Sequence, residues 1–323
     1  MPLNENDRRW LAAHPEFEKR ESMRRRHDDH DYYGRCVYLL TFCAARRRSI
    51  FGTLHAEDDK HGRPWIELSA VGEVVKRHCL NIPSHRQEIS VLECEVMPDH
   101  VHLIVFVIRK MPCHLGIVVS GLKAGIRKEL SEKGTSVQWE AGYNDTILRH
   151  KDQLENMRNY VRDNPRRLWV KLNNPNFFTQ HKGVTIGNTS VTAIGNLFLL
   201  NHPIKVFVQC SRRMTEEQID NECKRILSMA AKGAILVSAC ISQGEKTIMK
   251  RAFAAGMSQI IILENGFTPR QKPSGQSFDA CAAGRLLLIA PWEHHYEKRA
   301  ITREQSLALN RLAFSICGTN QEK

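Results

Sequence analysis

The C-terminal half of the chain is constrained most strongly by short apolar strands that alternate with helices. Strands that are apolar at almost every position are typically buried on both faces, and a helix between two of them favours parallel pairing. This pattern predicts an α/β fold with a doubly wound parallel sheet. The expected strands cover residues 204–210, 234–239, 259–263 and 285–290, and the expected helices cover residues 215–232, 245–255 and 303–316.

The N-terminal half shows a different order of elements. Residues 36–43 form a strand pattern rich in aromatic and β-branched side chains, and residues 90–97 and 100–108 form two more. Pro98 and Asp99 separate the last two strands and are typical of a tight turn. We therefore expect a small antiparallel sheet with helices packed on it, which is an α+β domain. The expected helices cover residues 65–79, 115–130 and 151–163.

The length of 323 residues suggests two domains rather than one. The pattern weakens between Asn173 and Leu200, where proline and glycine recur, and we place the boundary near Gln180. The expected parts are a basic polar arm at residues 1–33, an N-terminal domain at residues 34–180 and a C-terminal domain at residues 181–323.

The net charge of +12 indicates a polyanionic partner. Nucleic acid is the commonest such partner, and an acidic membrane surface is the alternative. No run approaches the roughly 20 apolar residues that span a bilayer, and no amphipathic anchor is visible, so we expect no membrane partner. Within the arm, the cluster Arg24-Arg25-Arg26 fits either a solvated tail or a segment that grips DNA.

The ten cysteines occur singly, mostly inside apolar runs, and no C-x-x-C pair suggests a zinc site. Buried free thiols in a reducing compartment are the expected outcome. The first 30 residues are crowded with charge and lack the apolar segment of a signal peptide. We therefore expect a cytoplasmic protein.

His100 and His102 form the first of two motifs that could carry chemistry. Successive side chains of a strand point to opposite faces, so these two imidazoles project from the same face and can converge on one metal ion. A His-x-His pair alone is also compatible with two hydrogen-bonded structural histidines.

Tyr160 and Asn164 form the second motif. Four residues are about one helical turn, so both side chains lie on one face of the helix. Pro165 disfavours a continued helix, which puts Asn164 in or just past the last turn and leaves its amide oxygen as a candidate ligand. Taken alone, the pair also fits a tyrosine at the edge of an apolar stripe and an asparagine that ends a helix.

Together the two motifs suggest a metal-assisted attack on a phosphate. Two imidazoles and an amide oxygen, with open positions for water or phosphate, suit Mg²⁺ or Mn²⁺ better than structural zinc. A phenol with an ordinary pKa near 10 is a poor nucleophile at neutral pH unless a cation or base assists it. A tyrosine held one turn from a metal ligand meets that requirement. Its attack would leave a phosphotyrosine on one DNA end and a free hydroxyl on the other.

The segment Met97-Pro98-Asp99-His100-Val101-His102 and the later Tyr160-x-x-x-Asn164-Pro165 resemble the HUH single-tyrosine transposases, specifically the REP-associated tyrosine transposase branch. The resemblance runs from about residue 38 to residue 169, and Gly142 to Arg149 is similar to the segment before the catalytic helix. It implies a ferredoxin-like fold, Tyr160 as nucleophile, and His100, His102 and Asn164 as metal ligands. Members of this family cut and rejoin single-stranded DNA beside a short hairpin.

Three basic clusters fit a DNA partner. One follows the first strand, one lies on the helix at residues 115–130, and one flanks the tyrosine motif. A solvated charged face would explain any one of them equally well. The expected phosphate contacts are Arg46, Arg47, Arg48, Lys123, Arg127, Lys128, Arg162, Arg166 and Arg167.

The C-terminal domain contains a strand, a turn of small residues and a helix N-terminus at residues 237–245, which together can cradle a phosphate. The candidate contacts are Ser238, Ser242 and Gly244. No G-x-G-x-x-G motif is present, so a dinucleotide is not indicated. The architecture is Rossmann-like, and residues 204–317 are similar to the corresponding domain of DprA-type DNA-processing proteins, notably at residues 238–256, 260–266 and 306–313. That family binds single-stranded DNA through this region.

The sequence leaves several alternatives open. The chain could be a non-catalytic DNA-binding or DNA-processing protein derived from such a transposase, or a metallophosphoesterase in which metal-bound water attacks. A pure protein-interaction role is a third alternative. Tyr143 is the rival nucleophile, although it lacks an amide partner one turn away. Whether a homodimer completes the active site is not decided by the sequence.

Overall fold

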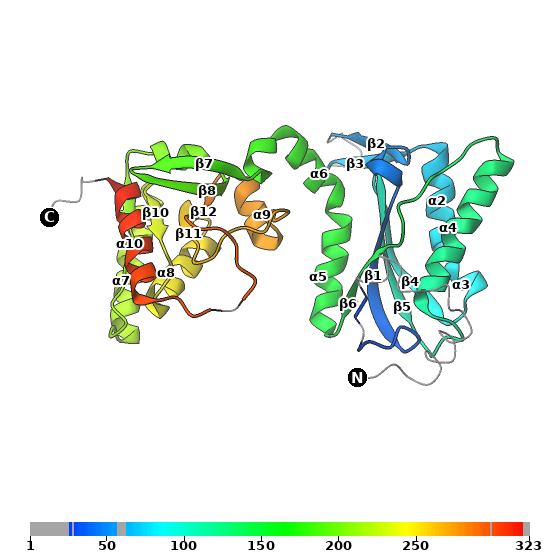
Figure 1. Ribbon diagram of the computed structural model, residues 1–323, viewed down its shortest axis with the longest axis horizontal. Coiled ribbons are helices and arrows are strands. Elements are labelled where there is room, and N and C mark those ends of the chain that lie inside the picture. Colours follow the sequence, from blue (N-terminus) through cyan, green and yellow to red (C-terminus); the bar gives the residue numbers. More distant parts are fainter. Residues whose placement is uncertain (1–25, 28, 57–62, 298, 319–323) are drawn as a thin grey trace. The chain divides into compact units, whose positions relative to one another are not determined.

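The computed structural model describes residues 26–27, 29–56, 63–297 and 299–318 (Figure 1). The chain divides into two compact units, Met1–Trp169 and Val170–Lys323. The domain boundary that we predicted near Gln180 lies C-terminal to the division between Trp169 and Val170. The position of the domain boundary stays a prediction. Most of the arm, including Arg24 and Arg25, lies outside the described residues. Among the described residues, no helix has both the length and the apolar character that crossing a bilayer requires.

The N-terminal unit is built on a four-stranded sheet with the strand order β4-β5-β1-β6. All neighbouring strands in it are antiparallel, which confirms the predicted sheet. Thr41 pairs with His102 on one side and with Asn144 on the other, so one residue of the central strand lies beside the histidine motif. The strands are β1 (Cys36–Cys43), β4 (Ile89–Val96), β5 (His100–Val107) and β6 (Asn144–Leu148).

Helices cover both faces of this sheet (Figure 1). Side chains such as Val101 and Leu103 pack under α2 and α4, while Leu39 and Ile104 pack under α5. The two-residue period of a strand explains this division, and it places His100 and His102 on the face that α5 covers. The helices are α2 (Ala70–Leu80), the short α3 (Ile82–His85), α4 (Leu115–Glu132) and α5 (Lys151–Arg162).

The helix predicted at residues 65–79 begins later than expected. Residues 65–68 form β3 (Trp65–Leu68), which pairs with β2 (Gly52–His55) in a separate hairpin. The Ser69 side chain accepts a hydrogen bond from the Gly72 backbone at 3.1 Å and so caps α2. Ile66 and Leu68 fit a period of two as well as a helical period, which is why the sequence pattern was misleading here.

Helix α5 ends before Pro165, as predicted, but a second helix follows at once. Only Asp163 separates α5 from helix α6 (Asn164–Asn173). Asn164 is therefore the first residue of a second helix and not the end of the first. Proline is well tolerated in the first turn of a helix, because the backbone N–H that it lacks has no partner there. Pro165 was expected only to stop a helix, so α6 was not predicted.

The C-terminal unit contains a six-stranded sheet with the order β7-β8-β12-β11-β10-β9. The last four strands are parallel, and the α/β fold class is confirmed. The sheet is mixed rather than all parallel, because the hairpin β7–β8 adds two antiparallel strands. Gly187 in its two-residue turn has a φ of +56°, which glycine adopts without strain. The strands are β7 (His181–Ile186), β8 (Thr189–Gly195), β9 (Lys205–Phe207), β10 (Ile235–Ser238), β11 (Gln259–Ile262) and β12 (Leu286–Ala290).

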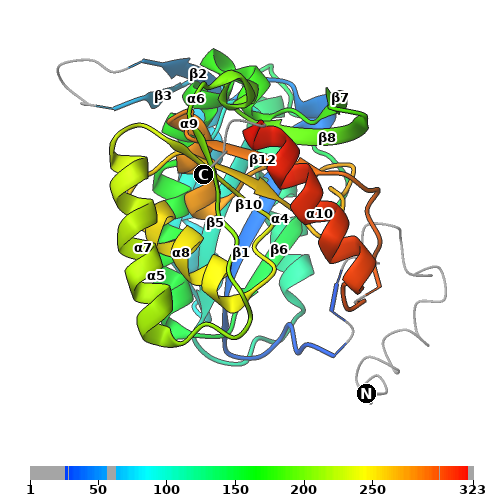
Figure 2. The same ribbon diagram turned by 90° about the vertical axis from the view of Figure 1, so that its left-hand side faces the viewer.

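Helices lie on both faces of this second sheet as well. One core joins Leu236 to α7 and α8, and the opposite core joins Val237 to α10. Figure 2 shows α10 across the sheet from α7 and α8. The helices are α7 (Glu216–Ala231), α8 (Gln243–Ala254), α9 (Gly275–Ala282) and α10 (Arg303–Cys317), with 3₁₀ turns η1 (Ala45–Arg47), η2 (Pro175–Phe178) and η3 (Leu197–Asn201).

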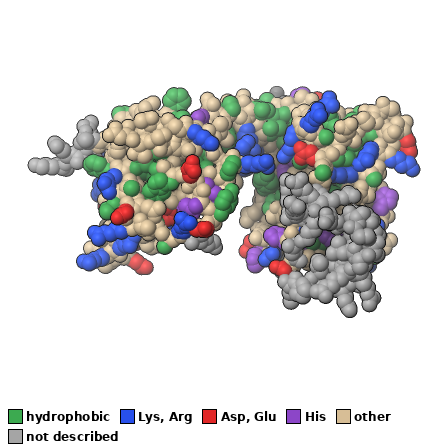
Figure 3. Space-filling model, viewed as in Figure 1, with side chains coloured by type: hydrophobic (Ala, Val, Ile, Leu, Met, Phe, Trp, Pro, Cys, Tyr) green, Lys and Arg blue, Asp and Glu red, His purple; other side chains and the backbone are tan. Residues whose placement is uncertain are grey.

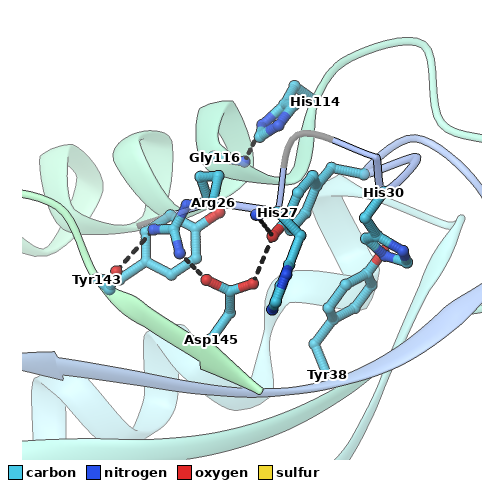
Figure 4. A network of polar contacts seen from close by, with 9 residues as sticks. Arg26, His27, His30, Tyr38, His114, Gly116, Tyr143 and Asp145 are labelled. Carbon is cyan, nitrogen blue, oxygen red and sulfur yellow. Dashed lines mark hydrogen bonds and ion pairs between the residues drawn. The ribbon is translucent and has the colours of Figure 1, made fainter. Parts of the chain in front are cut away.

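A buried ionic network fixes the segment that leads into β1 (Figure 4). The Asp145 carboxylate on β6 forms an ion pair with Arg26 and accepts a hydrogen bond from the Tyr32 hydroxyl at 2.8 Å. The side chains of Arg26 and Asp145 are only 10% and 3% exposed. The Arg26 guanidinium also lies 3.6 Å from the centre of the Tyr143 ring. Asp145 therefore ties residues 26–32 to the sheet.

Replacing Asp145 with alanine should destabilise the N-terminal unit by about 3 kcal/mol, because the Arg26 charge would stay buried without its partner. Chemical denaturation followed by tryptophan fluorescence measures the change. Asp152→Ala, an exposed carboxylate in the first turn of α5, is the control and should cost less than about 1 kcal/mol. Equal effects of the two substitutions would contradict a structural role for Asp145.

Candidate active site

The two histidines of the first motif converge at the start of β5. Their Nε2 atoms lie 3.2 Å apart, and their rings are nearly perpendicular. Nδ1 of His100 lies 2.6 Å from Oδ1 of Asp99, and Nδ1 of His102 lies 2.8 Å from Oγ1 of Thr41. Each ring is thus held at its Nδ1 atom, with Nε2 directed toward the other histidine.

These contacts define which ring atoms are available as ligands. An ionised carboxylate can only accept, so the proton of a neutral His100 lies on Nδ1 and its Nε2 presents a lone pair. The Thr41 hydroxyl can accept from His102 in the same way, and both lone pairs then face one point. Two ligand atoms about 2.1 Å from one ion, and at a right angle to each other, are separated by about 3 Å. The observed spacing therefore fits a single shared cation.

Asp99 is itself held in place. Its Oδ2 lies 3.2 Å from the Arg47 guanidinium. Burial opposes ionisation of the Asp99 carboxyl, but the hydrogen bond with His100 and the positive charge of Arg47 outweigh it, and the pKa of Asp99 is lowered. Arg47 and its neighbour Arg46 have φ values of 52° and 56°, which L-residues adopt at a cost of about 1 kcal/mol or more each. The turn after β1 thus accepts strain and brings Arg47 to Asp99.

Tyr160 lies beside this pair and not in a core. Its side chain on α5 is 38% exposed, and its ring centre is 5.6 Å from that of His102. The Arg167 guanidinium on α6 lies 5.4 Å from the centre of the same ring. The structure therefore brings the tyrosine of the second motif to the histidines of the first.

Asn164 lies one turn after Tyr160 and is 8% exposed. Its amide nitrogen donates to the backbone carbonyl oxygens of Tyr160 at 2.7 Å and Val161 at 3.4 Å. These hydrogen bonds use only the nitrogen, so the amide oxygen is the atom suited to a cation. The break between α5 and α6 positions this side chain, because both carbonyls belong to the last turn of α5.

No group of three or more His, Cys, Asp or Glu side chains that could hold a metal occurs in the part of the chain that the structure describes. Two imidazoles with an amide oxygen fall outside such groups. Imidazole nitrogens and an amide oxygen carry no negative charge, so a divalent cation held by them would need a further anion, such as a phosphate, to balance its charge.

Three residues near the site could not be assigned a role from the sequence. Thr41 and Asp99 orient the histidines, and only the strand register and the turn conformation reveal them. Glu95 is a third addition, because it pairs across the sheet with His102. Burial raises the pKa of Glu95 to about 7, against the opposing charges of Lys76 and Arg63, and the Glu93 carboxylate adds to the increase.

The basic clusters are distributed differently from the expectation. Figure 3 shows Lys and Arg side chains spread over the visible face rather than gathered in one stripe. Arg127 and Lys128 are exposed on α4, which covers the sheet face opposite to that of the histidines. Arg127 and Lys128, which were expected to contact DNA, therefore do not lie on the side of the histidine site. Helical position alone does not tell which face of the sheet a helix covers.

Lys123, the third member of the α4 cluster, is a further correction. Its side chain is 8% exposed, and its ammonium group donates to the backbone carbonyls of Glu140 at 3.0 Å and Gly142 at 2.5 Å. Burial lowers the pKa of Lys123 to about 8. This lysine holds the segment before β6 and does not lie on a surface that DNA could contact.

The basic residues on the helices that carry Tyr160 and Asn164 have acidic partners. Arg162 pairs with Glu93 at 2.7 Å, and Arg166 pairs with Asp163 at 2.6 Å. Arg167 is buried to 7% exposure beside the Tyr160 ring. Arg46 and Arg48 are exposed in the turn after β1, next to Arg47.

The position of Tyr143, the rival nucleophile, does not suit a nucleophile. It packs against the core on the α2 and α4 side, and the Arg26 guanidinium covers its ring. Burial raises the pKa of Tyr143 to about 12, although the Arg26 charge opposes the increase. Trp139 packs against Phe42 and Phe51, as expected for a core residue.

The predicted phosphate loop of the C-terminal unit is filled by a side chain of its own. The buried Glu245 carboxylate accepts from the backbone nitrogens of Ile241 at 2.8 Å and Cys210 at 3.2 Å. Ser238 donates to the Val208 carbonyl at 3.0 Å, while Ser242 caps α8 at the Glu245 nitrogen.

Gly244, the third predicted contact in this loop, has no room for a ligand at its Cα. A Cβ atom there would lie 2.9 Å from that of Cys210. The donors that a phosphate would use at this helix N-terminus already serve a carboxylate, so the arrangement does not favour phosphate binding.

Comparison with known proteins finds a family similar to the N-terminal unit. The family described as "Transposase IS200 like" matches residues 33–164. The matched segment covers less than half of the 323 residues, so it shows a similarity of the N-terminal unit to these transposases. The matched range includes both histidines, Tyr160 and Asn164, and the resemblance noted from the sequence is confirmed at this level.

Individual relatives are more distant. A Haemophilus influenzae protein of uncharacterised function is 23% identical over 168 residues, which are 45% of this chain and 88% of that protein. Among solved structures, a REP-associated tyrosine transposase bound to a REP hairpin is 14% identical, with a TM-score of 0.33 over 43% of this chain and 72% of its own.

Two further structures show similarities of the same order. DNA processing protein A from Helicobacter pylori, described with its single-stranded DNA binding mode, is 17% identical, with a TM-score of 0.33 over 43% of this chain and 66% of its own. A putative transposase from Deinococcus radiodurans is 16% identical, with a TM-score of 0.26 over 43% of this chain and 95% of its own.

The raised pKa of Glu95 predicts a pH-dependent effect of Glu95→Gln. The folded unit keeps the carboxyl protonated up to about pH 7, whereas the unfolded chain releases the proton above about pH 4.5. The contribution of Glu95 to stability is therefore present below pH 4.5 and lost as the pH rises through 7. At pH 8 the glutamine variant should be more stable than the wild type by about 3 kcal/mol, since the two pKa values differ by about 2.5 units.

Denaturation at pH 4.5 and pH 8, in a metal chelator, measures this difference. The two proteins should be nearly equal in stability at pH 4.5. The exposed Glu155→Gln on α5 serves as control and should show no such pH dependence. A glutamine variant that is less stable than the wild type at pH 8 would rule out a buried, protonated Glu95.

Proposed function

We propose that the chain is a metal-dependent endonuclease and strand transferase of single-stranded DNA, a transposase that acts through a covalent phosphotyrosine. The observation that carries the proposal is the pair of Nε2 atoms 3.2 Å apart, with the Tyr160 ring 5.6 Å from that of His102. The match of residues 33–164 to the family described as "Transposase IS200 like" supports DNA as the substrate. DNA that carries a hairpin is the proposed form of the substrate, on the resemblance to the REP-associated branch.

The proposed ligands of the cation are His100, His102 and Asn164. A Mg²⁺ or Mn²⁺ ion bound there would polarise the scissile phosphate and offset the negative charge that develops on it. Asp99 and Thr41 keep the two imidazoles in the tautomer that presents Nε2. The last turn of α5 holds the Asn164 nitrogen, so the oxygen of the same amide is directed by the helix break.

Tyr160 is the proposed nucleophile. Its phenolic oxygen forms a bond to phosphorus while the bond from phosphorus to one sugar oxygen breaks. The phenolic proton leaves to solvent, and the released sugar oxygen takes up a proton to become a free hydroxyl. One phosphodiester is exchanged for another, so attack by a DNA hydroxyl on the phosphotyrosine reverses the step and joins strands.

DNA contacts near this site are proposed for the exposed arginines of the turn after β1, Arg46 and Arg48, and for Arg162 and Arg166 on the helices that carry Tyr160 and Asn164. Arg162 and Arg166 would exchange their carboxylate partners for phosphate oxygens. Arg167 is proposed to steady the Tyr160 ring. Every side chain in this proposal comes from one chain, so it does not depend on a homodimer.

Replacing Tyr160 with phenylalanine should abolish covalent attachment of the protein to a labelled hairpin-bearing oligonucleotide, because the attacking oxygen is lost. A denaturing gel in the presence of Mn²⁺ measures the adduct. Tyr143→Phe is the matched control and should retain most of the adduct, since its hydroxyl is buried in the core. Cutting by the phenylalanine variant at the wild-type rate would favour attack by water and overturn the tyrosine mechanism.

Replacing Thr41 with valine should weaken Mn²⁺ binding by about tenfold, because the partner that orients the His102 ring is removed without a large change in shape. Isothermal titration of the DNA-free protein measures the affinity. Thr146→Val, an exposed threonine on the neighbouring strand β6, should bind Mn²⁺ like the wild type. Equal affinities for all three proteins would show that Thr41 does not position a ligand.

A further inference from the structure

A pocket of about 650 Å³ opens in the N-terminal unit, away from the histidine pair. Its walls come from the segment before β1, the ends of β1, β5 and β6, and the start of α5. The residues that matter for its chemistry are His30, Arg35, Phe106, Arg149, His150 and Leu154. A volume of this size is typical of pockets that hold a small molecule or one unit of a polymer.

The strand register fixes where the pocket lies relative to the active site. Val37, which lines the pocket, pairs with Phe106 and Leu148 at one end of β1, whereas Cys43 pairs with His100 at the other end. Six residues of strand separate these ends, a distance of about 20 Å. The pocket and the histidines are therefore distinct sites at opposite ends of one sheet.

Both sites lie on the same face of that sheet. Val37 and Leu154 pack with the small core under α5, and Tyr160 lies six residues after Leu154 on the same helix. Helix α5 thus runs from the pocket to the candidate active site. A ligand long enough to follow this helix could contact both.

The chemistry of the walls fits a nucleotide. Four of the lining side chains are basic and none is acidic, while Val37, Leu148 and Leu154 form an apolar surface. The Arg35 guanidinium lies 5.2 Å from the centre of the half-buried Phe106 ring. Unpaired bases stack on aromatic rings and on guanidinium planes, and exposed arginines such as Arg149 bind the phosphates beside them.

His30, which lines the pocket, belongs to a segment that the ionic network of Asp145 holds in place (Figure 4). Asp145 contacts Arg26 and Tyr32, which flank His30 in the sequence. Nε2 of His30 lies 2.8 Å from the Tyr38 hydroxyl oxygen. Burial and the positive charge of Arg149 lower the pKa of His30, so this ring serves as a neutral hydrogen-bonding wall. The charge of the pocket then comes mainly from Arg35 and Arg149.

We propose that this pocket binds one unpaired nucleotide of the DNA strand whose backbone is cut at the histidine site. Its base would stack at Phe106 and Arg35, and its phosphate would contact Arg149. The proposal rests on the proposed function for the identity of the ligand as DNA. It adds a second contact about 20 Å from the metal ligands, which would set how the strand lies along α5.

The test measures binding separately from cutting. The probe is a fluorescein-labelled single-stranded oligonucleotide with a hairpin, titrated with the full chain in a chelator and followed by anisotropy at several salt concentrations. The variants are Arg149→Ala, Arg149→Lys and Phe106→Leu. Arg303→Ala, an exposed arginine at the start of α10, is the matched control.

The expected result is about tenfold weaker binding for Arg149→Ala, with a salt dependence reduced by about 0.7 in the log–log slope. Arg149→Lys should recover most of the affinity. Phe106→Leu should weaken binding about tenfold without changing the slope, because stacking and not charge is lost. Arg303→Ala should match the wild type, and thermal unfolding should be the same for all four variants.

Two results would contradict the proposal that this pocket binds a nucleotide. One is wild-type affinity and slope for both Arg149→Ala and Phe106→Leu, and the other is a wild-type protein that does not bind the probe at all. Failure of the proposed function gives a different pattern, since the pocket variants would still lose affinity while the wild type forms no covalent adduct in Mn²⁺. If the wild type forms the covalent adduct while the pocket variants keep the DNA affinity of the wild type, the cutting mechanism is supported and the second binding site is contradicted.

Discussion

The central constraint of the N-terminal unit is the approach of two imidazole nitrogens to 3.2 Å. Asp99 holds the proton of His100 on the far side of its ring, and Thr41 can do the same for His102. Two lone pairs at that distance repel each other unless a proton or a cation lies between them. The hairpin β4–β5, the strained turn at Arg46 and Arg47, and the register of β1 all serve to hold this arrangement. The site is therefore built to receive positive charge.

The residues that would carry the chemistry could be found from sequence, because spacing alone puts His100 with His102 and Tyr160 with Asn164. The contact between the histidine motif and the tyrosine motif could not be derived from spacing, since it depends on which face of the sheet α5 covers. The same limit explains why two expectations about basic residues differ from the structure. Arg127 and Lys128 lie on the opposite face, and Lys123 is buried against two backbone carbonyls. Thr41 remained invisible because its role comes from pairing across strands.

The C-terminal unit shows how one side chain can alter the meaning of a motif. The strand, turn and helix at residues 237–245 form as the sequence predicts, and the α/β class is confirmed. Glu245, however, takes the backbone donors of Ile241 and Cys210. A glutamate three residues into a helix pattern reads as an ordinary favourable charge near the helix N-terminus, so its inward orientation was not predictable. The unit has the predicted fold, but the Glu245 carboxylate occupies the backbone donors at the N-terminus of α8.

Pulsed electron paramagnetic resonance of Mn²⁺ bound to the DNA-free protein tests the shared cation site most directly. That measurement detects nitrogen nuclei attached directly to the ion. A cation shared by His100 and His102 should show coupling to two imidazole nitrogens, one of which disappears in His102→Ala. A bound Mn²⁺ with no directly attached nitrogen, or a spectrum unchanged by His102→Ala, would contradict the shared site on which the mechanism depends.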